Sequence, residues 1–248
     1  MSEHFLYGMH AVLAALENPH RTIKKLFINQ ERNDNRLQAL LEKAAQRGVV
    51  SEFLSTALMN RRYPDVSHQG VVASVSPLPE YNESHLPQLL DACKSKALIL
   101  VLDGVTDPHN LGACLRTADA AGVDFVIIPK DKSASITPTV SKVACGAAES
   151  VPVVRVTNLA RAMSALKANG IWIYGAAGEA EASLYSIDSK TTSIALVLGA
   201  EGDGLRRLTR DLCDALFCLP MLGEVSSLNV SVATGVCLYE VVRQRLVV

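Results

Sequence analysis

The sequence predicts an α/β protein whose C-terminal part holds a mostly parallel sheet with helices on both faces. From Ala97 onward, short apolar runs of strand length alternate with helical patterns, which is typical of parallel strands joined by crossover helices. The 248 residues, 49% of them apolar, can bury one large core or two small ones. Residues 76–96 contain three prolines and lack periodicity, so we predict a linker there between domains at 1–75 and 97–248.

The first 75 residues predict a small α/β unit. A helical pattern over Arg36–Gln46 places Leu37, Leu40 and Leu41 at helical spacing, and Gly48 closes the helix. The other predicted elements of this unit are a helix at Met9–Leu16, which Asn18-Pro19 ends, and strands at Ile23–Ile28, from Val49 onward, and at Gln69–Val75.

The C-terminal part predicts six strands and four helices in alternation. In sheets of this kind, ligands bind at the carboxyl ends of the strands. The predicted strands are Leu98–Leu102, Phe125–Ile128, Pro152–Val156, Ile171–Tyr174, Ile194–Leu198 and Ala215–Leu219. The predicted helices are Asn110–Ala121, Pro138–Cys145, Leu159–Ala168 and an apolar helix that begins after Ser226-Ser227-Leu228-Asn229.

The charge of the chain argues against wholesale nucleic-acid binding. Non-specific affinity for nucleic acid comes from Lys and Arg, and the formal net charge is −1. Residues 1–75 nevertheless carry nine Lys and Arg against seven acids. Within that unit, Arg61-Arg62-Tyr63 is the local candidate for a phosphate and base contact, and we interpret the other charges as solvated surface.

The six cysteines indicate reduced, buried thiols, because most lie in apolar segments and none forms a C-x-x-C pair. Cys213 and Cys218 have no second Cys or His pair nearby to complete a zinc site. No apolar run approaches the roughly 18 to 20 residues of a membrane span, and the N-terminus lacks the pattern of a signal peptide. We therefore expect a cytoplasmic protein without a metal site or a membrane segment.

The first candidate site follows the strand Leu98–Leu102. Asn110 can serve as the N-cap of the next helix, or its side chain can face a ligand at the strand ends. Arg116 lies in an otherwise small and apolar helix, where a guanidinium facing the sheet would be costly without an anionic partner. We expect Arg116 to reach back along the helix toward its N-terminus and to bind a phosphate or an acidic ligand.

The second candidate site is the turn Gly199-Ala200-Glu201-Gly202-Asp203-Gly204. Its spacing is neither the G-x-G-x-x-G dinucleotide fingerprint nor a P-loop. Glycine allows a ligand to approach the backbone closely, and Glu201 is either solvated or an acceptor for a polar ligand. Acidic residues in the turn disfavour phosphate, so a neutral or cationic ligand suits it better.

The third candidate site is Leu219-Pro220-Met221 together with the segment Ser226-Ser227-Leu228-Asn229. A capped core helix explains the apolar residues that follow but leaves Ser227 and Asn229 without a role. Leu219 and Leu228, with exposed backbone groups beside them, can hold a purine between them. These observations favour a pocket lined largely by main chain.

In this order and spacing, the three sites resemble the SpoU (TrmH-like) branch of the SPOUT methyltransferases. The motifs are N-x-G-A-x-x-R, G-A-E-G-x-G, and L-P-M followed by S-S-L-N-V-S-V-A, and the resemblance covers about 97–248. Residues 1–75, with Tyr7–Val12 and His68–Ala73, resemble that family's substrate-binding domain, an α/β fold like that of ribosomal protein L30e. Over its full length, the chain is similar to the bacterial members that methylate guanosine in 23S rRNA.

The resemblance implies a deep trefoil knot in the C-terminal domain, a homodimer formed through that domain, and S-adenosyl-L-methionine as the methyl donor. It implies methyl transfer to the ribose 2'-hydroxyl of a guanosine in 23S rRNA or a large-subunit precursor, without a metal. The implied cofactor contacts are Gly199, Leu219, Met221, Ser227 and Leu228, with Ala176 and Gly178 as possible lining residues. The implied catalytic or RNA-contacting positions are Asn110, Arg116, Glu201, Ser227 and Asn229, and we expect further RNA contacts from Arg61 and Arg62.

A guanidinium effectively never loses its proton, so Arg116 is not a suitable general base. We expect it to bind the phosphate of the target nucleotide and to stabilise the developing alkoxide. Two alternatives share these motifs: a tRNA ribose 2'-O-methyltransferase, and an inactive relative that only binds rRNA during ribosome assembly. The presence of Asn110, Arg116, Glu201 and Asn229 together favours an enzyme over the inactive relative.

Overall fold

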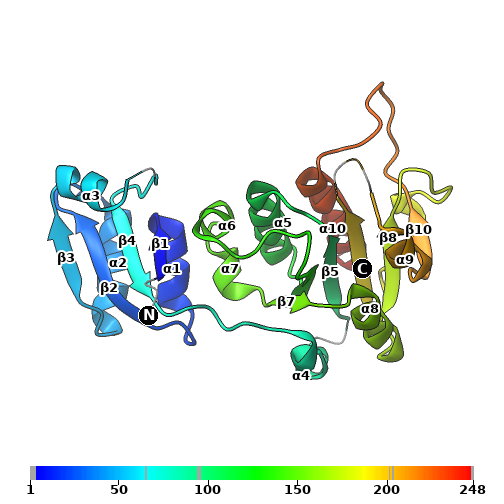
Figure 1. The fold of residues 1–248 in the computed structure, drawn as a ribbon, viewed down its shortest axis with the longest axis horizontal. Helices are drawn as coiled ribbons and strands as arrows, with labels where there is room; N and C mark the ends of the chain where they lie inside the picture. The colour runs from blue at the N-terminus through cyan, green and yellow to red at the C-terminus, as the bar shows by residue number, and fades with distance from the viewer. Residues whose placement is uncertain (1–3, 65, 94–95, 201, 203, 247–248) are drawn as a thin grey trace. The chain divides into compact units, whose positions relative to one another are not determined.

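The structure, a computed structural model, describes residues 4–64, 66–93, 96–200, 202 and 204–246. The fold divides into two compact units (Figure 1). Met1–Pro79 and Ile136–Ser150 make up the first unit, and Glu80–Ser135 and Val151–Val248 make up the second. The chain therefore passes between the units three times.

The first unit is built on a four-stranded sheet. Its strand order is β1 (His4–Tyr7), β4 (Val71–Val75), β2 (Ile23–Asn29) and β3 (Ser51–Leu54). β4 runs antiparallel to both β1 and β2, whereas β2 and β3 are parallel. The predicted strands are confirmed, with β3 and β4 each beginning two residues later than expected. β1 lies outside the predicted elements.

Apolar layers cover both faces of this sheet. α1 (Met9–Glu17) and α2 (Asn35–Gln46) pack on the face that carries Leu26 and Ile28. α3 (Thr56–Arg62) packs on the other face, where Met59 and Tyr63 meet Phe27. α1 and α2 confirm the predicted helices, and neighbouring strand residues serve opposite layers because side chains alternate along a strand.

Two short helices from the middle of the sequence complete the first unit. α6 (Pro138–Val143) and α7 (Ala147–Ser150) contact α1. At the turn between them, Gly146 has a φ of +103°, and a Cβ added there would lie 2.5 Å from the Cβ of Ala14. Only glycine combines this backbone conformation with so close an approach.

A buried ion pair joins α7 to the start of β2. Arg21 Nε lies 3.2 Å from Glu149 Oε2, and the two side chains are only 4% and 2% exposed. Asn18 Nδ2 also donates a hydrogen bond to the Glu149 carbonyl oxygen at 2.8 Å. Burial raises the pKa of Glu149 and lowers that of Arg21, and the charge of each partner opposes the shift of the other.

The second unit contains six parallel strands, as the sequence predicts. Their order is β10 (Ala215–Phe217), β8 (Trp172–Ala176), β9 (Ile194–Gly199), β5 (Leu98–Asp103), β6 (Phe125–Pro129) and β7 (Val153–Val156). β5 and β9 pair in the middle of the sheet over their whole lengths, from Leu98 opposite Ile194 to Asp103 opposite Gly199. All the paired strands therefore present their carboxyl ends at one edge.

Helices cover both faces of the six-stranded sheet, which confirms the predicted fold class. Ile99 and Val101 pack in one apolar layer with α8 (Leu159–Ala168) and α4 (Leu86–Asp91). Leu100 and Leu102 point to the opposite layer, where α5 (Pro108–Ala120) and α10 (Val230–Leu246) contact each other. The remaining short elements are η1 (Glu83–His85), η2 (Leu184–Ser186) and α9 (Arg207–Asp211). The trefoil knot stays a prediction.

The contacts of the chain differ from the predicted domain boundaries in two places. Residues 136–150 pack in the first unit, as described above. Much of the predicted linker packs in the second unit, where Leu86 is buried and Tyr81 forms a parallel bridge with Val154. Proline density suggested a linker, but apolar residues at helical spacing, including Leu86 and Leu90, find a core to pack on. No helix among the described residues is long and apolar enough to cross a membrane.

We predict that Glu149→Ala lowers the free energy of unfolding by about 3 kcal/mol, because it leaves the Arg21 guanidinium buried without its counter-charge. Urea denaturation followed by circular dichroism measures the change. Lys43→Met, which breaks the surface pair with Glu17, is the matched control and should cost far less. Equal losses of unfolding free energy in the two variants would show that the buried pair stabilises the fold no more than the surface pair does.

Candidate active site

The predicted cofactor residues gather at the carboxyl edge of the six-stranded sheet. Ala176 ends β8, Gly199 ends β9, and Leu219 follows β10 by two residues. In the strand register, Ala176 lies opposite Phe217 and Gly199 lies opposite Asp103. Gly178 follows β8 by two residues and is exposed. The segments that follow β10, β8, β9 and β5 therefore all begin at the same edge of the sheet.

The turn after β9 is closed by the chain's own backbone. A Cβ on Gly199 would lie 2.1 Å from the Gly204 carbonyl carbon, so no other residue fits at position 199. Gly204 N donates to Ala200 O at 3.0 Å, and Gly202 and Gly204 both have positive φ. Close approach is required here, as predicted, but for Gly199 the neighbour is backbone and not a ligand. The predicted site residue Glu201 lies outside the described residues.

The segment between β10 and α10 projects from the sheet (Figure 1). Leu219 and Met221 are half-buried, whereas Ser227 is exposed and Leu228 is 37% exposed. Leu222, at the outer part of this segment, is 98% exposed. The predicted purine-binding leucines thus retain accessible apolar surface.

Two predicted catalytic residues meet directly. Asn229 Nδ2 donates a hydrogen bond to Asn110 Oδ1 at 3.1 Å. Asn229 also caps α10, because its Oδ1 accepts from Ser231 N at 2.9 Å. One amide side chain thereby starts the last helix and joins it to α5. This contact links residues that are 119 positions apart in the sequence.

Asn110 is not the N-cap of its helix, contrary to one of the two interpretations of the sequence. α5 begins at Pro108, and Asp107 caps it by accepting a hydrogen bond from His109 N at 3.0 Å. Proline is favoured in the first helical position because its missing N–H has no partner there anyway. Asn110 lies within the first turn, so its side chain is available for the contact with Asn229.

Arg116 does not face the sheet. Leu111, Leu115 and Ala118 form the buried side of α5, and Arg116 is exposed on another side. Its guanidinium forms no ion pair with any described residue. The argument from the cost of a buried guanidinium therefore fails, but an exposed and uncommitted guanidinium remains able to bind an anionic ligand.

α5 and α10 approach closely along the side that carries the two asparagines. A Cβ on Gly235 would lie 3.8 Å from Thr117 Cγ2, and Cys114 Sγ lies 3.4 Å from Thr234 Oγ1. Cys114 and Thr234 are fully buried. Small side chains at this contact allow the two helices to pack tightly, which fixes Asn110 relative to Asn229.

The cysteines supply no nucleophile to this site. All six are free thiols, but only Cys114 and Cys237 are fully buried and the other four are half-buried, so the expectation of burial holds only in part. Burial raises the pKa of Cys213 and of Cys237 to about 12, which keeps both thiols protonated. Among the described residues, no group of three or more His, Cys, Asp or Glu side chains could hold a metal ion.

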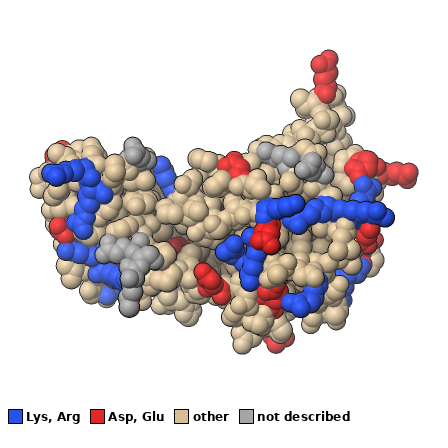
Figure 2. Space-filling model, in the orientation of Figure 1, with Lys and Arg blue, Asp and Glu red and all other residues tan. Residues whose placement is uncertain are grey.

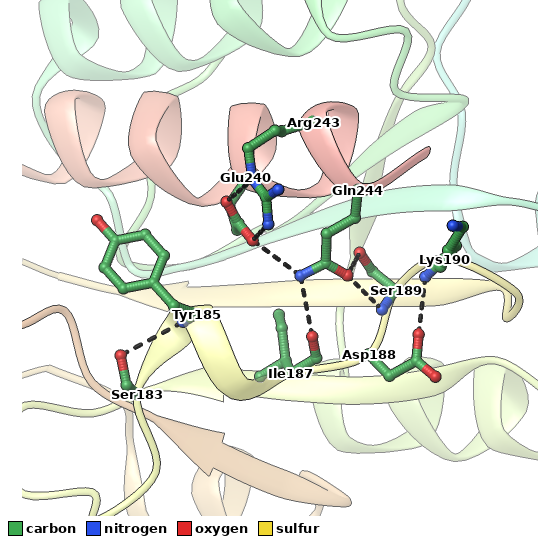
Figure 3. Close-up of polar contacts among 9 residues, drawn as sticks. All are labelled: Ser183, Tyr185, Ile187, Asp188, Ser189, Lys190, Glu240, Arg243 and Gln244. Carbon is green, nitrogen blue, oxygen red and sulfur yellow. Dashed lines mark hydrogen bonds and ion pairs between the residues drawn. The ribbon is translucent and has the colours of Figure 1, made fainter. Parts of the chain in front are cut away.

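A polar network ties the end of α10 to the connection between β8 and β9 (Figure 3). Gln244 Oε1 accepts hydrogen bonds from Ser189 N at 2.9 Å and Ser189 Oγ at 2.8 Å, and Gln244 Nε2 donates to Ile187 O at 3.0 Å. The Arg245 guanidinium donates to four carbonyl oxygens, those of Ser189, Lys96, Ala97 and Thr192. We call Ser189, Gln244 and Arg245 the C-terminal clasp.

The connection held by the clasp also reaches the predicted cofactor segment after β10. Cys218 N donates to Ala182 O and Leu184 N donates to Cys218 O, both at 2.8 Å. Leu184 is fully buried. Cys218 immediately precedes Leu219. Hydrogen bonds therefore join the end of α10 to the connection after β8, and join that connection to the start of the segment after β10.

The predicted RNA-contacting residues of the first unit lie at the end of α3. Arg61 and Arg62 are exposed, and the Arg62 guanidinium lies 4.3 Å from the centre of the Phe27 ring. Tyr63 is only 6% exposed and packs against Phe5 and Phe27, with ring centres 5.4 and 5.8 Å away. Tyr63 therefore belongs to the core and does not offer a face for stacking on a base.

The chain matches two family models. The model of the SpoU rRNA methylase family matches residues 97–239. The chain belongs to the SpoU rRNA methylase family. Residues 5–81 of this SpoU protein also match the family model described as RNA 2'-O ribose methyltransferase substrate binding.

Curated relatives of this SpoU protein match over nearly its whole length. It is 54% identical to the 23S rRNA (guanosine-2'-O-)-methyltransferase RlmB of Vibrio vulnificus over 246 residues, which cover 99% of both chains. It is also 54% identical to the RlmB of Escherichia coli K12, with 99% of this chain and 100% of the relative covered.

A solved structure has the same fold. The SpoU methyltransferase AviRb of Streptomyces viridochromogenes, in complex with the cofactor AdoMet, superposes with a TM-score of 0.80 at 26% identity. The superposition covers 99% of this chain and 91% of AviRb.

We predict that Arg245→Met lowers the free energy of unfolding by about 3 kcal/mol, because four carbonyl oxygens lose a charged hydrogen-bond donor. Arg243→Met is the control on the same helix: Arg243 is mostly exposed, and among the described residues it pairs only with Glu240, so the change should be much smaller. Thermal unfolding and urea titration of the full chain measure both. A loss for Arg245→Met no larger than that for Arg243→Met would contradict a structural role of the clasp.

Proposed function

We propose that this SpoU protein transfers a methyl group from S-adenosyl-L-methionine to the ribose 2'-hydroxyl of a guanosine in 23S rRNA. The observation that carries the proposal is the 54% identity to RlmB along nearly the whole chain. The contact between Asn110 and Asn229 at the carboxyl edge of the sheet supports it, because both residues occupy positions implied to be catalytic. For a protein that acts on bacterial rRNA, we expect the cytoplasm as the place of action.

The residues at the carboxyl edge suit S-adenosyl-L-methionine. Leu219, Met221 and Leu228 offer partly accessible apolar surface for an adenine ring. Gly178, which follows the neighbouring strand β8, is exposed. Ala176, Gly199 and Ser227 are the other residues that would hold the cofactor. When bound, the cofactor supplies an activated methyl group. The chain's own residues must then orient the ribose and assist the loss of the proton from its 2'-hydroxyl.

A ribose hydroxyl is a poor nucleophile until its proton is lost, so the protein must combine positioning with stabilisation of the developing charge. Asn110 and Asn229 hold each other through a hydrogen bond, which fixes two polar side chains at the proposed site. Arg116 is exposed and unpaired among the described residues, so its guanidinium is available for a phosphate or for the developing alkoxide. We assign Glu201 to the same site on the motif alone.

We further propose that the protein acts as a homodimer through α10. Val232, Tyr239 and Leu246 on this helix are 52%, 51% and 74% exposed, although the helix belongs to the core of its unit. Val232 and Tyr239 are seven residues apart, so they lie on one side of the helix. A second copy of this chain would remove that apolar surface from water.

The central test follows label from radioactive S-adenosyl-L-methionine into 23S rRNA that lacks the modification. We expect label in a guanosine ribose of 23S rRNA and none in tRNA. Label confined to tRNA would favour a tRNA ribose 2'-O-methyltransferase. A folded protein that binds this rRNA but transfers no label would favour an assembly factor.

In the same assay, we predict that Arg116→Lys lowers methyl transfer at least about tenfold while the dissociation constant of the cofactor stays unchanged. Lysine keeps the charge but loses the planar fork that binds phosphate through two parallel hydrogen bonds. Arg116→Met should lose more. Near-normal methyl transfer by Arg116→Lys would exclude a phosphate contact through two parallel hydrogen bonds. It would indicate that Arg116 acts through its charge alone.

We also predict that the double variant Arg61→Met/Arg62→Met binds the rRNA roughly tenfold more weakly and with a weaker dependence on salt, because fewer phosphates are neutralised. The matched control is Arg36→Met/Lys43→Met, which removes two charges from α2 on the opposite face of the sheet. Filter binding at several salt concentrations measures both. Equal effects of the two double variants would refute a specific contact by α3.

A further inference from the structure

A buried carboxylate at the end of β5 holds an arginine at the edge of the sheet that carries the active site. The Asp103 side chain is fully buried. Its Oδ2 accepts a hydrogen bond from Arg206 N at 3.1 Å, and its Oδ1 lies 2.8 Å from Arg206 Nε. A buried carboxylate is costly unless it is paired, so this contact fixes the position of the guanidinium.

The outer end of the Arg206 guanidinium remains uncommitted. Asp103 engages Nε and the backbone N–H, and neither Nη1 nor Nη2 hydrogen-bonds to any residue in the described part of the chain. The Arg206 side chain is 47% exposed. Nη2 lies 3.6 Å from where a Cβ on Gly104 would be, and Gly104 has a φ of +89°.

The position of the pair points to the substrate. Asp103 lies opposite Gly199 in the strand register, and Asn110 follows Asp103 by seven residues, so Arg206 shares an edge with the proposed methyl-transfer residues. Basic side chains also form a row across the second unit (Figure 2).

We propose that Arg206, held in place by Asp103, binds a backbone phosphate of the RNA substrate beside the methyl-transfer site. A guanidinium with Nη1 and Nη2 free presents two donors in the geometry that matches two phosphate oxygens. In a chain with a net charge of −1, such a fixed cation supplies attraction at the place where the RNA must be positioned. The inference rests on the proposed function for the identity of the ligand as RNA.

The cofactor also carries an anionic group, its carboxylate, and the experiment separates the two ligands. RNA binding to the full chain is measured by filter binding, and S-adenosyl-L-methionine binding by calorimetry. Both readouts are independent of catalysis. Failure of the wild-type protein to methylate would refute the proposed function, whereas unchanged RNA binding by Arg206→Met would refute this inference.

For Arg206→Met we expect RNA affinity to fall roughly tenfold at about 100 mM salt, and the slope of log affinity against log salt to weaken by about one. Cofactor affinity should not change. Arg206→Lys should keep most of the slope, because it keeps the charge. If Arg206→Met fails to fold because Asp103 loses its partner, Arg206→Gln decides, since its amide can still donate to the carboxylate.

The matched control is Lys167→Met, which removes one charge at the opposite edge of the same sheet. Lys167 Nζ lies 2.7 Å from Asp214 Oδ1, and Asp214 Oδ2 accepts from Ile173 N near the start of β8. This variant should leave RNA affinity and its salt dependence almost unchanged. Equal losses for Lys167→Met and Arg206→Met, or a tenfold loss of cofactor affinity in Arg206→Met, would overturn the proposal.

Discussion

The parallel pairing of β5 with β9 is the interaction on which the rest of the active site depends. Both strands are buried on both faces, and their register ends with Asp103 beside Gly199. At that point one strand contributes a buried carboxylate and the other begins a turn in which only glycine fits. Hydrophobic burial sets the strands side by side, and the register then decides which polar groups meet at the edge.

The site itself is held together by contacts between segments far apart in sequence. Asn229 caps the last helix and bonds to Asn110, while the small residues Gly235 and Thr234 let α10 approach α5 closely. At its other end, α10 is fixed by the clasp to the connection that follows β8. One helix therefore holds Asn229, a proposed catalytic residue, at its beginning, and at its end it contacts the connection that leads to the proposed cofactor residues.

Much of the fold could be predicted because local signals agree with the tertiary structure. The continuous apolar runs predict the parallel strands, and the helical spacing of apolar residues predicts α2 and α8. Other features depend on partners that no local pattern reveals. The direction of Arg116 depends on which side of α5 packs on the sheet, and Tyr63 is buried by aromatic rings from two strands. The pair Asp107-Pro108 indicates the start of α5, but Asn110 is also a residue type favoured at an N-cap, so the sequence left two possible starts.

The placement of α6 and α7 has a consequence for the order in which the protein is made. Glu149, the partner of Arg21, and Gly146, which packs on Ala14, are synthesised long after the strands of the first unit. That unit cannot complete its packing until Ser150 has left the ribosome, by which time β5 and β6 of the second unit have also emerged. The first unit can therefore complete its packing only after part of the second unit has been synthesised, whereas the second unit must still wait for β7 to β10 and for α10.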